Sequence, residues 1–158
     1  MFIWSVRASS LKFIIACVLC VGVVGALIAI IPFTDGGRVV MAGVNFDGIN
    51  GEEDVRNFLT SLGWTVSQEK SPVTEEVTIP DEFDRVFVNY NEIQKRQGLD
   101  LSKYKRKKVT RYTYEVTNYE GYEGTVYANV IVYRGRVVGG DLCSAAPDGF
   151  VCTLQGER

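Results

Sequence analysis

The hydrophobic residues of this chain follow three different patterns in turn. Residues 13–33 form one continuous apolar run, and residues 34–48 mix glycines with short apolar patches. Residues 49–158 then switch between helical and strand spacing. The patterns predict a membrane segment, a tether and one folded domain.

The apolar run is long enough to cross a membrane. Its 21 residues carry no charge, and as a helix they would cover about 30 Å, the thickness of a hydrocarbon core. Arg7 and Lys12 precede the run, which places residues 1–12 in the cytoplasm and residues 49–158 outside it. We therefore expect a single-pass membrane protein whose residues 13–33 lie in the lipid bilayer.

Two other interpretations of the run fit its sequence less well. A cleavable signal peptide would have a shorter apolar centre and a small-x-small cleavage site, whereas this run ends in AIIPF. Lipid attachment at Cys17 would leave only four apolar residues after Lys12. Cys17 and Cys20 form a C-x-x-C spacing among apolar neighbours, which is typical of helix packing and not of redox or zinc chemistry.

Helical spacing begins after the tether, which we place at residues 34–48. Asn50 can cap a helix that starts with acidic residues, and Gly63 can end it. Short strands are expected at 64–66 and 76–79. A second helix should begin near Pro80-Asp81-Glu82 and end at Gly98. Its apolar stripe, which we expect to face a sheet, comprises Phe83, Val86, Phe87, Tyr90, Ile93 and Gln97.

Alternating apolar and polar residues then predict three or four strands. They lie within 109–117, 125–133, 136–145 and 150–154, with a tight turn at Arg134-Gly135. The fold class is α+β, with two helices packed on one face of an antiparallel sheet.

Short motifs occur in a fixed order along this domain. They are NFL at 57–59, GWTV at 63–66, VTIP at 77–80, YNEIQK at 90–95, GLDL at 98–101, RYTY at 111–114, ANV at 128–130 and GGD at 139–141. Together they resemble a Gram-positive bacterial family catalogued as domain of unknown function 4830, over about residues 52–154. The resemblance implies a small membrane-anchored or exported protein with no assigned activity, and it transfers no catalytic residue.

Composition removes several classes of function. The chain has no histidine, which excludes histidine-dependent nucleophile pairs and histidine metal sites. Its 17 basic and 19 acidic residues lack the basic excess of a nucleic-acid-binding domain. We expect no cofactor, no metal and no nucleic-acid partner.

The strongest local charge is a basic run that could bind an anion. Its members are Lys103, Lys105, Arg106, Lys107, Lys108 and Arg111. Anionic lipids and wall polymers are the polyanions available outside a Gram-positive cell. The alternative is a solvated loop that leads into an edge strand, where lysines prevent unwanted strand pairing.

Asp141 follows the pair Gly139-Gly140, which indicates a bulge or a close backbone approach in the strand. A hairpin closed at Arg134-Gly135 would place Asp141 on the same face as Val130, where it needs a buried donor or lies beside a cleft. A structural hydrogen-bonding role is the simpler interpretation. The alternative is a hydrolase that combines Asp141 with a second carboxylate.

Cys143 and Cys152 flank the turn AAPDGF. A hairpin centred between residues 147 and 148 would set them directly opposite each other and allow a disulfide. Two free buried thiols are the alternative.

These patterns favour a noncatalytic, membrane-anchored module outside the cytoplasm. Its partner would be an envelope protein, an anionic lipid or a wall polymer. The carboxylate-dependent hydrolase centred on Asp141 remains the alternative. A third hypothesis is a structural accessory subunit that acts through its transmembrane helix, which an intact phenotype after deletion of residues 50–158 would favour.

Overall fold

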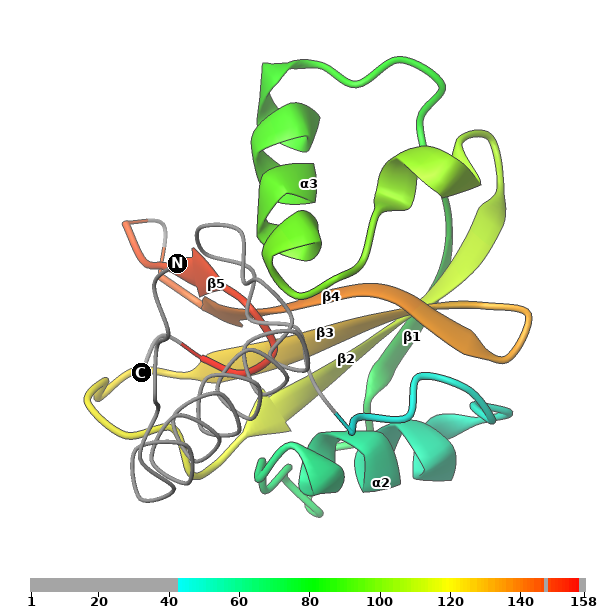
Figure 1. Ribbon diagram of the computed structural model, residues 1–158. Coiled ribbons are helices and arrows are strands. Elements are labelled where there is room, and N and C mark those ends of the chain that lie inside the picture. The colour runs from blue at the N-terminus through cyan, green and yellow to red at the C-terminus, as the bar shows by residue number, and fades with distance from the viewer. Residues whose placement is uncertain (1–42, 147, 157–158) are drawn as a thin grey trace, which may run out of the picture. The chain divides into compact units, whose positions relative to one another are not determined.

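The computed structural model describes residues 43–146 and 148–156 of the chain. The predicted membrane segment at 13–33 and most of the predicted tether lie outside these residues. The described elements are the helices α2 (Glu52–Ser61) and α3 (Arg85–Arg96), the 3-10 helix η1 (Leu101–Tyr104), and the strands β1 (Val73–Thr78), β2 (Lys108–Val116), β3 (Val126–Tyr133), β4 (Arg136–Ser144) and β5 (Val151–Cys152) (Figure 1).

The five strands form one sheet in the order β1-β2-β3-β4-β5, and all neighbours are antiparallel. This confirms the predicted antiparallel sheet. Arg134 and Gly135 both have positive φ, at 48° and 77°, as a two-residue hairpin turn requires. The strand expected at 64–66 is reduced to a single bridge between Val66 and Val116.

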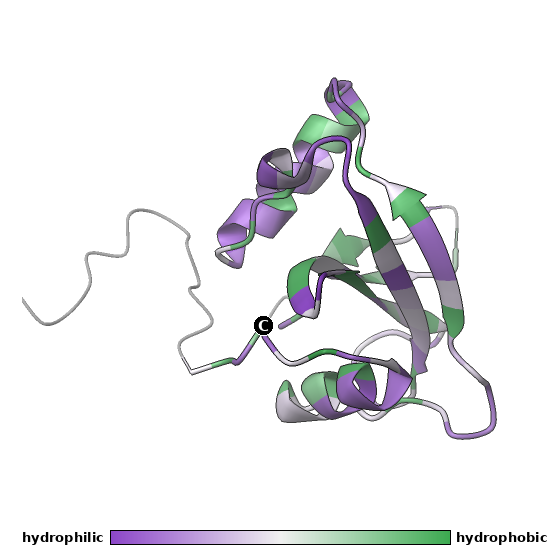
Figure 2. Ribbon diagram, turned by 90° about the vertical axis from the view of Figure 1, so that its right-hand side faces the viewer, coloured by the Kyte–Doolittle hydropathy of each residue, from purple (hydrophilic) through white to green (hydrophobic). Residues whose placement is uncertain are grey.

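The two helices cover opposite faces of the sheet, so the prediction that they share one face was wrong. Alternate side chains of β3, such as Val130, pack in the same core as Leu59 of α2. Ile131 points the other way and packs with Phe87 of α3. Figure 1 shows α3 above the sheet and α2 below it, and the view turned by 90° agrees (Figure 2). Because β3 and β4 are apolar on both faces, each face needs its own cover.

The ends of α2 show one confirmed and one incorrect expectation. Gly63 follows the helix with a φ of 91°, the left-handed conformation that glycine adopts readily. The N-cap is Gly51 and not Asn50. Asn50 instead donates its backbone N–H to Oδ2 of Asp54, at 2.8 Å.

Helix α3 begins later than the sequence indicates. Asp84 is its N-cap, and Oδ1 of Asp84 accepts the backbone N–H of Phe87 at 2.7 Å. Residues 80–83, where we expected the first turn, precede the helix. Gly98 ends it with a φ of 80°, as predicted.

The last part of the predicted tether belongs to the folded domain. The backbone of Phe46 accepts a hydrogen bond from Val137, and Ile49 donates one to Gly135. Asp47 forms an ion pair with Arg136, at 2.7 Å. Residues 46–49 therefore cover the beginning of β4.

Candidate functional site

The buried face of α3 carries three polar side chains, and the sequence pattern placed only Gln97 of the three toward the sheet. Asn91, Gln94 and Gln97 are at most 3% exposed, whereas Val86 of the predicted apolar stripe is 76% exposed. Phe87 and the other aromatic residues of the stripe do pack on the sheet. Helix α3 therefore joins the sheet through amide side chains as well as through apolar contacts.

Gln94 of α3 and Gln97, which caps the C-terminal end of that helix, bind the backbone of β4. Oε1 of Gln94 accepts the N–H of Gly140 at 2.8 Å, and Nε2 of Gln97 donates to the Gly140 carbonyl at 2.6 Å. Oε1 of Gln97 also accepts the N–H of Leu154, at 3.0 Å. The two amides thus take the place of a neighbouring strand at Gly140.

The glycines of β4 make this approach possible. A Cβ at Gly140 would lie 2.6 Å from Cδ1 of Leu154 and 2.7 Å from the carbonyl oxygen of Asn129. A Cβ at Gly139 would lie 2.9 Å from Cδ2 of Leu101. Any larger residue would push apart the elements that meet here.

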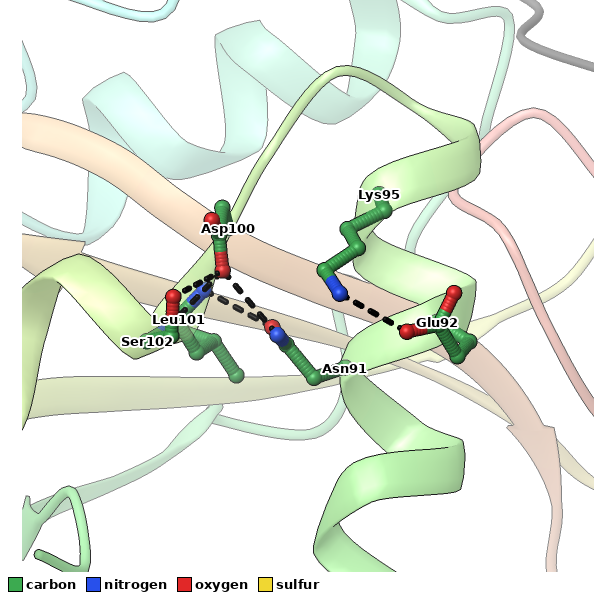
Figure 3. Close-up of polar contacts among 6 residues, drawn as sticks. All are labelled: Asn91, Glu92, Lys95, Asp100, Leu101 and Ser102. Atoms are coloured by element: carbon green, nitrogen blue, oxygen red, sulfur yellow. Dashed lines mark hydrogen bonds and ion pairs between the residues drawn. The ribbon is translucent and has the colours of Figure 1, made fainter. Parts of the chain in front are cut away.

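A second polar cluster fixes the loop after α3 (Figure 3). Asn91 accepts the N–H of Leu101 at 2.8 Å and donates to Asp100 at 3.0 Å. Asp100 also accepts the hydroxyl of Ser102, at 2.7 Å. Burial acts to raise the pKa of Asp100, but the hydrogen bonds from Asn91 and Ser102 outweigh it and hold that pKa below its ordinary value. The cluster ties η1 to α3.

A bulge in β4 reverses the face on which Asp141 lies. Val132 pairs with Val137 and Ile131 pairs with Gly139, so Val138 has no partner in the ladder. The paired glycines correctly predicted a bulge. However, the extra residue turns Asp141 toward α3 and away from the face that holds Val130, because one inserted residue inverts every side chain beyond it.

Asp141 is 4% exposed and lies within a hydrogen-bonded cluster. Its Oδ1 accepts the Tyr90 hydroxyl at 2.6 Å, and its Oδ2 accepts Nδ2 of Asn129 at 2.9 Å. The same Asn129 nitrogen lies 3.4 Å from Sγ of Cys143, and the Thr113 hydroxyl donates to Asn129 Oδ1 at 2.7 Å. Asp141 therefore has the buried donors that its sequence position requires.

Burial determines the protonation behaviour of this cluster. It raises the pKa of Asp141, although the hydrogen bonds from Tyr90 and Asn129 act in the opposite direction. It also raises the pKa of the Cys143 thiol, and it raises the pKa of Tyr90 well above its ordinary value. All three shifts favour the uncharged forms.

The Asp141 cluster opens into a pocket of about 350 Å³ beside α3. Arg111 of β2 adds a guanidinium to its polar side, and the Nε of Arg111 is buried without a hydrogen-bond partner among the described residues. The apolar side consists of Val77, Ile79, Phe87, Ile131 and Val151. The pocket combines an apolar wall with a few converging polar groups, as small-ligand sites do.

Three of the six members of the predicted basic run form ion pairs with acidic side chains. Lys108 pairs with Glu76 at 2.8 Å, Arg111 pairs with Glu75 at 2.6 Å, and Arg106 pairs with Asp81.

The other three lysines of the run are exposed. They are Lys103, Lys105 and Lys107. The ammonium of Lys105 lies 5.2 Å from the centroid of the Phe83 ring. Half of the run therefore forms ion pairs with the edge strand β1 and the loop after it. The expectation that the run leads into an edge strand was wrong, because β2 lies between β1 and β3.

The predicted disulfide between Cys143 and Cys152 is not formed. Cys143 is opposite Val151, and Cys152 is opposite Leu142. This register is one residue away from the predicted one, so the two cysteines point to opposite faces of the sheet.

Sequence reasoning singled out Asp141, Arg111 and Cys143, each for a different reason, and did not bring them together. It missed Tyr90 and Asn129 as partners of Asp141. A signal was available for Asn129, which is a polar residue within the otherwise apolar segment ANVIV.

Within 43–146 and 148–156, no helix is both long and apolar enough to cross a membrane. The same residues hold no group of three or more cysteine and acidic side chains placed to bind a metal ion.

Comparison with curated proteins and with solved structures finds no match. Comparison with known families finds a match to the one described as domain of unknown function DUF4830, over residues 58–142. The matched region includes α3, its glutamines and Asp141, and it covers more than half of the 158 residues. The chain therefore belongs to the DUF4830 family.

Proposed function

We propose that this protein is a noncatalytic binding module, held in a membrane by residues 13–33, and that its ligand site is the pocket beside α3. The observation that carries the proposal is the geometry of that pocket. It places the Arg111 guanidinium and the Asp141 cluster next to an apolar wall. Such a site holds an apolar group and orients it through a few polar contacts.

The chemistry of the lining favours binding over catalysis. A cysteine nucleophile needs a lowered pKa, but burial raises the pKa of the Cys143 thiol. Both oxygens of Asp141 already accept hydrogen bonds from Tyr90 and Asn129. The hydrogen bonds hold the side chains of Asp141, Tyr90 and Asn129 in fixed positions in the pocket wall.

The hydrolase alternative lacks a second acid in this position. Glycosidase-type hydrolysis uses two carboxyl groups about 5–9.5 Å apart. Among the described residues that line the pocket, Asp141 supplies the one carboxyl group.

The proposed partner is an envelope protein or an anionic envelope component outside a Gram-positive cell. Lys103, Lys105 and Lys107 support an anionic contact, since they are exposed and form no ion pair with other described residues. The membrane location rests on the uncharged length of residues 13–33.

Crosslinking of the tagged full chain in intact cells tests the pocket. Val151 lines it and is 48% exposed, so Val151→Trp can fill it at little cost to the fold. Val88→Trp is the matched control, because Val88 is 44% exposed on α3 and does not line the pocket. We expect V151W to lose the crosslinked adduct and V88W to keep it.

If V151W crosslinks as well as the unmodified chain does, the pocket is not the ligand site. Cell fractionation tests the location separately. Recovery of the intact chain in the soluble cytosolic fraction, or resistance of the domain to protease added to whole cells, would overturn the membrane-anchored external arrangement.

A further inference from the structure

The two edges of the sheet differ in how many of their backbone N–H and C=O groups have hydrogen-bond partners. Over β4, residues 46–49 cover the beginning of the strand, Gln94 and Gln97 bind Gly140, and β5 pairs with the end. Strand β1 forms the opposite edge. Five of its six residues are exposed, including Val73 at 55%.

The register shows which backbone groups of β1 face outward. Ile79 donates its N–H to the Lys107 carbonyl at 3.0 Å, so it is bonded toward β2. Hydrogen-bonded residues alternate along an antiparallel strand. Thr74, Glu76 and Thr78 therefore direct their N–H and C=O groups away from β2, and no backbone partner for them occurs among residues 43–146 and 148–156.

We infer that β1 is a docking edge for an extended segment of a partner protein, which adds as a sixth strand. The added strand would satisfy the outward backbone groups of Thr74, Glu76 and Thr78. This inference concerns an edge and not the pocket, so it goes beyond the proposed function.

Side chains on the two faces of β1 define the chemistry of the segment. On the α3 face, Val73 and Val77 offer apolar neighbours on either side of Glu75, whose carboxylate pairs with Arg111 of β2 at 2.6 Å. Val77 continues into the apolar wall of the pocket. On the other face, Glu76 offers a carboxylate whose side chain is 64% exposed even though it pairs with Lys108. A segment that alternates apolar and basic residues matches this edge.

The same charges disfavour a second copy of this chain as the occupant. In an antiparallel pair of β1 edges, outward residues must lie opposite outward residues. The two registers with the greatest overlap then place Glu75 opposite Glu75, or Glu76 opposite Glu76. Like charges directly opposite each other destabilise strand pairing.

The test uses the full chain in detergent micelles and a defined probe. The probe is a blocked heptapeptide of alternating valine and lysine, and its control has glutamate in place of lysine. Hydrogen exchange should slow at the amides of Thr74, Glu76 and Thr78 when the lysine peptide is added. The glutamate peptide should bind at least tenfold more weakly.

Glu76→Pro provides the decisive variant. Proline is tolerated on an edge strand where its missing N–H would face solvent, so E76P removes one outward donor and leaves the β1–β2 ladder intact. We expect at least tenfold weaker binding of the lysine peptide. Glu76→Val keeps the N–H and is the matched control for loss of charge.

Equal binding by E76P and E76V would overturn strand addition, as would protection of amides outside β1. Equal binding of the two peptides would overturn the basic preference. If E76P fails to fold, as judged by circular dichroism, the hydrogen exchange of the unmodified chain tests the inference instead. Slower exchange at Thr74, Glu76 and Thr78 supports strand addition, and its absence overturns it. V151W should leave peptide binding unchanged, which separates this result from the test of the pocket.

Discussion

Replacement of Gln97 by alanine is the sharpest test of how α3 is attached to the sheet. Gln97 is 2% exposed and binds two distant backbone groups, the carbonyl of Gly140 at 2.6 Å and the N–H of Leu154 at 3.0 Å. Its Nε2 also donates to Gln94 at 2.8 Å. Gln97→Ala leaves these buried groups without partners.

The expected loss follows from those contacts. An unsatisfied buried backbone group costs about 1–3 kcal/mol of folding free energy. Q97A leaves two such groups, the Gly140 carbonyl and the Leu154 N–H. Two groups at that cost give about 2–6 kcal/mol, and partial relaxation of the backbone lowers the upper end, so we expect Q97A to lower the free energy of unfolding by about 2–4 kcal/mol. Against a total of about 5–15 kcal/mol for a domain, this loss would be large.

Urea unfolding followed by tryptophan fluorescence measures the change. Arg96→Ala is the matched control, because Arg96 is the exposed neighbour in the same helical turn, and it should change stability by no more than about 0.5 kcal/mol. A loss below about 1 kcal/mol in Q97A would refute the view that the glutamines substitute for an edge strand.

Three further substitutions test the Asp141 cluster and the glycine contact. Tyr90→Phe removes the donor to Asp141 and should cost about 1–3 kcal/mol in urea unfolding; an unchanged midpoint would contradict the buried hydrogen bond. Because burial raises the folded pKa of Asp141 above its ordinary 3.8, its contribution to stability is present below that value and is lost as pH rises through the folded pKa. Asp141→Asn should therefore gain stability relative to the unmodified chain as pH increases across this window, and a parallel pH dependence would refute the shift. Gly140→Ala places a Cβ 2.7 Å from the Asn129 carbonyl oxygen and should lower stability by about 1–3 kcal/mol, so a melting temperature equal to that of the unmodified chain would show that the site can relax.

Much of the fold could be predicted because its signals are local. The glycines at 63 and 98 end helices through their own backbone freedom, and the turn at 134–135 depends on two residues alone. The alternation of apolar and polar residues identified strands β2 to β4, because that pattern too depends only on residues close together in the sequence. The short strand expected at 64–66 failed, because a segment needs an available partner strand to become more than a bridge.

The candidate site was harder to predict because its members come together from distant parts of the chain. Tyr90 and Asp141 are 51 positions apart, and Gln97 and Leu154 are 57 apart. The spacing of α3 placed Gln97 toward the sheet but not Gln94, and it could not show that both amides bind Gly140.

By itself, the sequence determined the order of the two helices and of strands β1 to β5, the likeness to DUF4830 and the apolar length of residues 13–33, since each depends on neighbouring residues. Tertiary structure alone decided that the helices take opposite faces, that Asp141 points toward α3, and that Cys143 and Cys152 point apart. The physical reason is the two-residue period of a strand. A bulge at Val138 and a one-residue register offset between β4 and β5 each invert the faces that a local pattern assigns.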